Sequence, residues 1–172
     1  MKKFLLLLTS IYLALVLLMP KVELYYTLKK ILERERIVLA QSDLKDRWFD
    51  LKIEGVKLYY DGIESARAEA VDLWPWLFYN QLRATGVRAG KDVRKMFDFN
   101  ADRITVRHSV LHPMAATIDA SGNFGKISGS VDVKSGKVKL RCEPTKRFRQ
   151  SQAFREFFRK TGEGYIYEST IR

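Results

Sequence analysis

An uncharged apolar run near the amino terminus constrains this chain more than any other feature. The run covers residues 4–19, follows Lys2 and Lys3, and is bounded by Pro20 and Lys21. As a helix with a rise of about 1.5 Å per residue it would be roughly 24 Å long, slightly less than the ~30 Å hydrocarbon core of a bilayer. The run is therefore either a short membrane anchor or a signal peptide.

The residues that end the run favour an anchor. Signal peptidase requires small residues in an Ala-x-Ala-like arrangement just past the apolar region. Here the run ends in Leu17, Leu18 and Met19, followed by Pro20. We therefore predict an uncleaved anchor over residues 1–20, with a removed signal peptide as the alternative. The anchor side chains expected to face lipid are Phe4, Leu8, Ile11, Leu15 and Leu18.

Charges near the run leave two orientations open. Lysines and arginines near a span tend to stay in the cytoplasm, and more of them follow the run than precede it. A literal count would place the following domain in the cytoplasm. However, long domains translocate largely regardless of charge, and a short lysine-bearing leader is typical of an export signal. We predict that residues 21–172 lie outside the cytoplasm.

Composition indicates one basic domain behind the anchor. No glycine-serine linker, low-complexity run or long repeat divides residues 21–172, and their number is sufficient for one hydrophobic core. The net charge of +11 predicts attraction to phospholipid head groups, nucleic acid or an acidic protein without choosing among them. The single cysteine, Cys142, leaves the redox compartment open.

The first half of the domain changes from helical to strand periodicity. Apolar positions recur at helical spacing over residues 22–33, and residues 37–39 form a short strand-like run. From Trp48 onward apolar and charged residues alternate, and the phase flips at Gly55, which predicts a β-bulge. Asp61 and Gly62 supply type I′ turn chemistry, so a second strand should return over residues 63–73. We expect its alanines on one face: Ala66, Ala68 and Ala70.

Further strand-like segments predict a mainly β, antiparallel meander sheet with one covered face. Pro75 lies in an aromatic run and indicates an edge strand or a bend. The remaining predicted strands cover residues 81–89, 93–99, 103–110, 115–121, 126–133, 137–142 and 165–171.

Between the last two of these strands the period becomes helical again. We predict a basic amphipathic helix over residues 146–160, with Thr145 as its N-cap, covering the open face of the sheet. Phe154, Phe157 and Phe158 would share one side of this helix. Arg149, Arg155 and Arg159 would lie on the other side.

Motifs that carry chemistry are weak, and we predict a non-enzymatic protein without catalytic residues, metal or cofactor. His108 and His112 lack further ligands at a recognisable spacing. Ser128 and Gly129 do not complete a nucleophile elbow, because the first glycine is one position too distant. Gly136 and Lys137 are followed by Val138, where a phosphate loop needs Ser or Thr.

Two aromatic segments are candidate lipid or partner surfaces. The phenylalanines of the C-terminal helix could enter lipid while its arginines meet phosphates, or they could pack on the sheet with the arginines solvated. The alternating aromatic residues of the second segment could line an apolar groove or form core. The candidate residues are Trp74, Trp76, Phe78, Arg149, Phe154, Arg155, Phe157, Phe158 and Arg159.

The order of these signals resembles a known family of envelope proteins. It is carried by the anchor, the helix over residues 22–33, the strand from Leu51 through Val56 and Leu58, and the glycine-punctuated run from Gly122 to Leu140. Together they resemble protein N of bacterial type II secretion systems and, more distantly, AsmA-like and TamB-like proteins. The resemblance implies a single-pass protein of the bacterial inner membrane whose periplasmic β-domain is an accessory of secretion or envelope assembly.

Two functional hypotheses follow, and a third depends on orientation. In the first, the domain is a scaffold whose sheet edges bind other envelope or secretion-system proteins by strand addition. In the second, the sheet is an AsmA-like module that holds phospholipid acyl chains in an apolar groove. A dry, continuous groove would favour the second hypothesis. A cytoplasmic domain that binds anionic lipid or nucleic acid remains only if the orientation is reversed.

Overall fold

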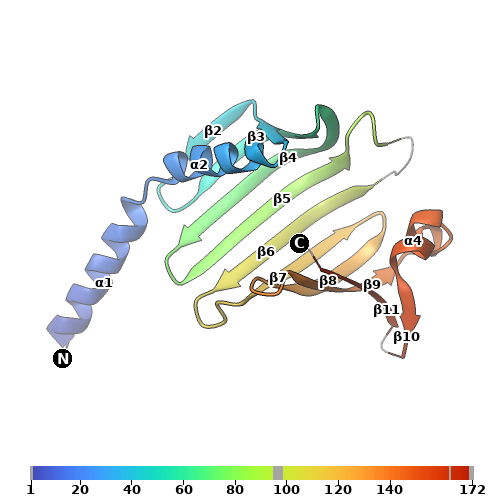
Figure 1. Ribbon diagram of the computed structural model, residues 1–172. Helices are drawn as coiled ribbons and strands as arrows, with labels where there is room; N and C mark the ends of the chain where they lie inside the picture. Colours follow the sequence, from blue (N-terminus) through green and yellow to red (C-terminus); the bar gives the residue numbers. More distant parts are fainter. Residues whose placement is uncertain (1, 95–98, 163, 171–172) are drawn as a thin grey trace.

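The computed structural model describes residues 2–94, 99–162 and 164–170 (Figure 1). Two helices at the amino terminus precede the sheet. Helix α1 (Lys2–Leu17) projects away from the sheet, and helix α2 (Lys21–Arg34) lies across it after a bend of 52°. The predicted helix over residues 22–33 is confirmed, because it coincides with α2.

The rest of the described chain is dominated by one antiparallel sheet of 11 strands. Its order is β1-β3-β4-β5-β6-β7-β8-β9-β11-β10, and β2 also pairs with β3. Strands β1 and β2 share one edge of β3, pairing with residues 57–60 and 51–54 respectively. The strands are β1 (Ile37–Ala40), β2 (Asp43–Asp46), β3 (Leu51–Tyr60), β4 (Ile63–Trp76), β5 (Tyr79–Ala89), β6 (Asn100–Ser109), β7 (Ala115–Gly122), β8 (Gly125–Asp132), β9 (Lys137–Pro144), β10 (Arg159–Thr161) and β11 (Gly164–Thr170).

The sequence predicted this meander well. The turn between β3 and β4 is confirmed, since Asp61 and Gly62 have positive φ angles of 50° and 79°, as a type I′ turn requires. Pro75 lies within β4 beyond Leu73, where the pairing of β4 with β3 ends, so Pro75 pairs with β5 alone. Strand β2 was not predicted. Most of the predicted strand over residues 93–99, and Ile171 of the last one, lie outside the described residues.

The side-chain phase flips at the same level in neighbouring strands. Ile53 and Val56 contact one apolar cluster although they are three positions apart, and Ala84 and Val87 do the same in another cluster. In β3 and β5 the flip occurs at a glycine in the left-handed region, Gly55 with φ 59° and Gly86 with φ 60°. The sheet thus keeps its apolar side chains on one face across the flip.

This common flip corrects two predictions. The β-bulge expected at Gly55 is wrong in position: β3 and β4 stay in register on both sides of Gly55, and the register shifts only between Leu58 and Tyr59. No extra residue is needed at Gly55, because the side-chain phase of β4 also changes at the position that faces Gly55. For the same reason Ala70 pairs with Glu54 on the charged face instead of lying beside Ala66 and Ala68.

The continuous C-terminal helix predicted over residues 146–160 is wrong. The segment forms two short helices, α3 (Lys146–Arg149) and α4 (Gln152–Phe157), and the described chain ends in strands β10 and β11. The break has a local cause: Ser151 adopts an extended conformation and its hydroxyl accepts a hydrogen bond from the backbone N–H of Phe154. Thr145 is confirmed as an N-cap, since its Oγ1 accepts from the N–H of Phe148 at 3.2 Å.

Gly86 offers a test of the flip. A Cβ atom at Gly86 would collide with the side chain of Glu69, and the left-handed backbone costs a non-glycine residue about 1–2 kcal/mol. We expect Gly86→Ala to lower the melting temperature measured by circular dichroism. The control, Gly162→Ala, adds a Cβ in open space and should have little effect. Equal melting temperatures for both variants would contradict the assignment.

Candidate functional site

A continuous apolar face extends across the sheet. Directly paired residues of antiparallel strands point to the same side, so the pairing identifies rows of side chains. Two parallel rows, together called the apolar face, run from β3 to β11. The first is Ile53, Val71, Ala84, Ile104, Ala120, Ile127, Cys142 and Tyr165. The second is Leu51, Leu73, Leu82, Val106, Ile118, Gly129, Leu140 and Tyr167.

The opposite side of the sheet is charged. Its side chains include Arg83, Arg103, Arg107 and Lys126, and it carries ion pairs such as Arg107 to Asp119 at 2.7 Å. The sheet therefore has one face suited to water and one that requires a cover.

Side chains from other elements cover the apolar face at two of its corners. Over β3 and β4, Tyr25 of α2 is 4% exposed and packs on Leu51 and Ile53. Its hydroxyl donates to Oε1 of Gln41 at 3.2 Å, and burial raises the pKa of this tyrosine. At the opposite end of the strands, Phe124 is fully buried beside Phe148.

Between these corners the apolar face is hollow. One hollow of about 280 Å³ lies between α2 and the middle of β3–β6, and another of about 300 Å³ lies between α2 and the ends of β4–β6. Both have walls formed almost entirely by carbon atoms and share Tyr25, Leu28, Leu73 and Leu82. Leu28 is 42% exposed although it lines both hollows. The second hollow reaches the lower end of the ~300–1,000 Å³ typical of small-molecule sites, and the first is slightly smaller.

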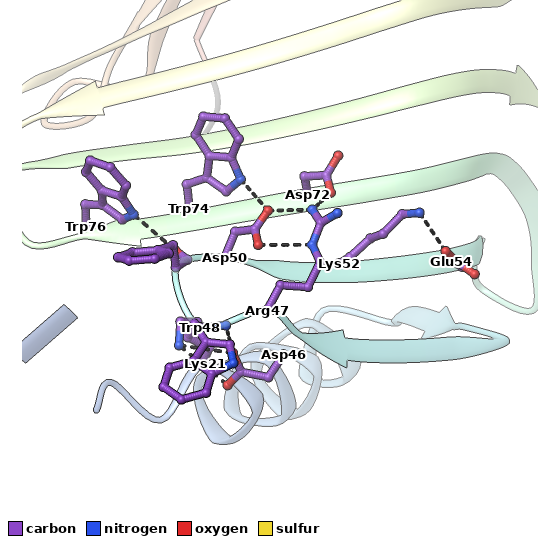
Figure 2. A network of polar contacts seen from close by, with 11 residues as sticks. Lys21, Asp46, Arg47, Trp48, Asp50, Lys52, Glu54, Asp72, Trp74 and Trp76 are labelled. Atoms are coloured by element: carbon purple, nitrogen blue, oxygen red, sulfur yellow. Dashed lines mark hydrogen bonds and ion pairs between the residues drawn. The ribbon is translucent and has the colours of Figure 1, made fainter. Parts of the chain in front are cut away.

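A polar network fixes α2 and the β2–β3 loop beside the hollows (Figure 2). Lys21, the first residue of α2, is 3% exposed and donates to Oδ1 of Asp46 at 3.1 Å. Arg47 joins the carboxylates of Asp50 and Asp72, and the hydrogen bond to Asp50 is the main cause that raises the pKa of Arg47. The network therefore links α2, the loop before β3, and β4.

The aromatic candidates of β4 are dispersed around this network. Trp74 donates from Nε1 to Asp50 at 2.7 Å and lies 5.5 Å from the Arg83 guanidinium, while also contributing to the wall of the second hollow. Trp76 donates to the carbonyl oxygen of Phe49 at 3.0 Å. Phe78 lies in the β4–β5 turn and stacks on Tyr12 of α1. The three side chains have separate surroundings and do not form one ridge.

The C-terminal candidates lie at the other end of the strands. Phe154 is 2% exposed between Phe148 and Tyr165, and Phe158 stacks on it at 5.3 Å. Phe157 is exposed. The Arg149 guanidinium lies 5.6 Å from the ring centroid of Tyr165, and Arg159 is exposed in β10. The side chain of Arg155 lies outside the described part of the structure. These residues are not brought together with Trp74, Trp76 and Phe78.

Sequence reasoning missed most of the apolar face. The alternation of Leu82 with Ala84, or of Ile104 with Val106, is visible in each strand. Only the pairing register shows that these residues continue one another from strand to strand. His108, which the sequence offers as a weak candidate metal ligand, contacts the carbonyl oxygen of Pro113 through its Nε2 atom at 3.1 Å.

Comparison with known proteins adds no relative: no protein-family model matches the chain, and neither does a curated protein or a solved structure. Among the described helices, no single one is both long and apolar enough to cross a bilayer. Helices α1 and α2 reach the length and composition of a span only when taken together, across their bend. The candidate site therefore rests on geometry alone.

Cys142 provides a probe of cover on the apolar face. It is 2% exposed, and burial raises the pKa of its thiol to about 11. Compared with the usual value of 9.0, this reduces the reactive thiolate about 100-fold near neutral pH. We expect Cys142 to react slowly with Ellman's reagent until denaturant is added. An exposed thiol in a Lys91→Cys variant should react at once, and similar rates for both thiols would contradict the burial.

Proposed function

We propose that this protein is a non-enzymatic, single-pass protein of the bacterial inner membrane whose periplasmic sheet binds the acyl chains of phospholipids. The observation that supports this proposal is the apolar face, which is continuous over eight strands and hollow beside α2. Contiguous accessible apolar surface marks a site that binds lipid, an apolar ligand or another protein. The open face favours the lipid-binding hypothesis over a scaffold with a filled core.

The dimensions of the apolar face suit an acyl chain. At about 4.8 Å between neighbouring strands, the rows from β3 to β11 extend over roughly 34 Å. An acyl chain in one leaflet occupies about half of the ~30 Å hydrocarbon core, so the face is long enough to hold it extended. The walls of both hollows are almost entirely carbon, which suits an acyl chain better than a head group.

The anchor and the charge complete the proposal. The α1 side chains are exposed over most of the helix, including Phe4, Leu6 and Leu8, as expected for a helix that contacts lipid. A net charge of +11 would hold the domain near anionic head groups. Tethering would keep the apolar face close to its source of lipid.

A scaffold role in type II secretion or envelope assembly, implied by the resemblance, is the second candidate. The described sheet is open, with β1 and β2 at one edge and β10 at the other. These edge strands are only 4, 4 and 3 residues long. Short edges provide few backbone groups for an added strand, which makes this the weaker proposal.

Photo-crosslinking tests acyl-chain binding. Full-length protein in vesicles would be irradiated with a phospholipid that carries a diazirine in its tail, and cross-linked peptides would be located by mass spectrometry. We expect cross-links in β4–β6 in addition to α1. The variant Ile104→Gln places an amide in the hollow and should reduce the β4–β6 cross-links about threefold or more, because burying an unpaired amide is costly.

The matched control is Arg103→Gln, which changes the neighbouring residue on the charged face. It should leave the cross-links unchanged. Circular dichroism would establish that both variants are folded. Cross-links confined to α1 in the wild-type protein would rule out acyl-chain binding by the sheet.

A topology reporter tests the orientation. We expect alkaline phosphatase fused to the carboxyl terminus to be active, since that enzyme folds only outside the cytoplasm, where disulfides form. A fusion to green fluorescent protein at the same position should be dark. The reverse pattern would place the domain in the cytoplasm and favour its binding to anionic lipid or nucleic acid there.

A further inference from the structure

Exposed apolar side chains gather in the loops at one end of the sheet. In an antiparallel meander every second turn lies at the same end, and the loop before β3 and the turns β4–β5, β6–β7 and β8–β9 share the end nearest α1 (Figure 1). We call their exposed apolar residues the apolar rim: Trp48, Phe49, Phe78, Leu111, Met114 and Val133. Leu111 is 83% exposed and Trp48 is 71% exposed, the two highest values for large apolar side chains among the described residues that follow Pro20.

The opposite end of the sheet differs. Its β3–β4 turn consists of Asp61 and Gly62, although Tyr60 and Ile63 beside it are exposed. Its β7–β8 turn contains Phe124, which points into the core and is fully buried. Among the described residues, the turns at the rim therefore expose several large apolar side chains, whereas the β7–β8 turn at the far end buries its phenylalanine.

The backbone conformation and hydrogen bonds of its loop hold Trp48 in an outward position. Its backbone adopts a φ of 69°, which is unfavourable for a bulky residue. The backbone N–H of Trp48 donates to Oδ1 of Asp46 at 3.0 Å, and Asp46 is held by the buried Lys21 (Figure 2). The network therefore stabilises a strained loop that exposes an indole ring, and such strain is characteristic of functional positions.

The rim contacts the helix that would enter the membrane. Phe78 stacks on Tyr12 of α1, with ring centroids 5.5 Å apart and an interplanar angle of 23°, and Val16 of α1 is 2% exposed. Tyr12 precedes the end of α1 by five residues, or about 7.5 Å along the helix axis. If α1 lies in a bilayer up to its last residue, Phe78 lies below that level.

We propose that the apolar rim inserts into the leaflet from which α1 emerges, so that the sheet stands on the membrane with its charged and apolar faces extending away from it. Rim insertion depends on α1 being a membrane anchor, as the proposed function has it. It does not depend on binding of acyl chains by the sheet. Aromatic rings together with nearby basic residues such as Lys134 and Lys137 are typical of membrane interfaces. Four separate loops at the end of the sheet nearest α1, one of them in contact with α1 through Phe78, fit a lipid surface.

Insertion would give lipid a dry entrance to the apolar face. The second hollow is lined by Pro75, Val106 and His108 at the rim end of β4–β6, and by Leu24 of α2. It lies directly behind the rim. A chain leaving the leaflet could therefore reach this hollow without crossing water.

Fluorescent labelling of the full-length protein tests the rim. Leu111→Cys and the control Lys91→Cys, an exposed residue at the opposite end of the sheet, would be labelled with an environment-sensitive NBD dye. Buried Cys142 should not compete for the label. In vesicles of phosphatidylethanolamine and phosphatidylglycerol, we expect the Leu111→Cys label to be quenched by doxyl-labelled lipid and about threefold less by aqueous iodide than the control.

A second loop keeps the test independent of any single variant. Val133→Cys, in the β8–β9 turn, should behave like Leu111→Cys. Labels at both positions that are quenched by iodide as strongly as the control would overturn the proposal, and so would labels shielded from iodide but not quenched by lipid, which would indicate a protein partner.

Carbonate extraction separates this inference from the proposed function. If the protein resists extraction but the rim labels are aqueous, rim insertion fails alone and acyl-chain binding still stands on its cross-links. If carbonate removes the protein from the membrane, α1 is not a membrane anchor, and the proposal that the rim inserts is rejected as well.

Discussion

Strand register is the constraint on which the rest of this structure depends. One residue of slip in any strand would move its apolar side chains to the charged face. From β3 to β6 the register holds even where the phase flips, because Gly55 in β3 and Gly86 in β5 allow left-handed backbone at the same level of the sheet; between β6 and β7 it shifts by one residue there. Separate short alternations thereby add up to a single apolar face across eight strands. Both the core and the hollows beside α2 are consequences of that alignment.

The polar network has the complementary role of limiting how much of that face is closed. Lys21 and Asp46 fix the start of α2, so that Tyr25 covers Leu51 and Ile53 while Leu28 stays above open space. A helix held more loosely would settle into the hollows, since burying apolar surface yields about 25 cal/mol per Å². Charged groups at the helix start thus help to keep the candidate site open.

The parts that were predictable from sequence are those governed by neighbouring residues. The Asp61–Gly62 turn, the α2 helix and most strands follow from local chemistry, and all are present. The C-terminal helix failed because helical spacing of Phe154 and Phe157 could not reveal that Ser151 begins a new helix and Phe158 leaves it. The candidate site was beyond sequence for a different reason: Leu82 and Ile104 face one hollow only through long-range pairing. Trp74, the most conspicuous candidate, is largely engaged by Asp50 and Arg83.

The proposed anchor is short, and the proposed insertion of the rim would account for its length. At roughly 24 Å, α1 falls short of a ~30 Å hydrocarbon core, and a span shorter than the bilayer must thin it locally or be supported by its flanks. The stacking of Phe78 on Tyr12 supplies such a flank, because it places a turn of the sheet beside the last two turns of α1. An anchor followed by a flexible linker would have to cross the whole hydrocarbon core by itself. An anchor that ends beside an apolar rim can be shorter, because the rim covers the remaining depth. If the rim inserts as proposed, the membrane contact would be shared between α1 and the sheet, and both would hold the mouth of the second hollow at the bilayer surface.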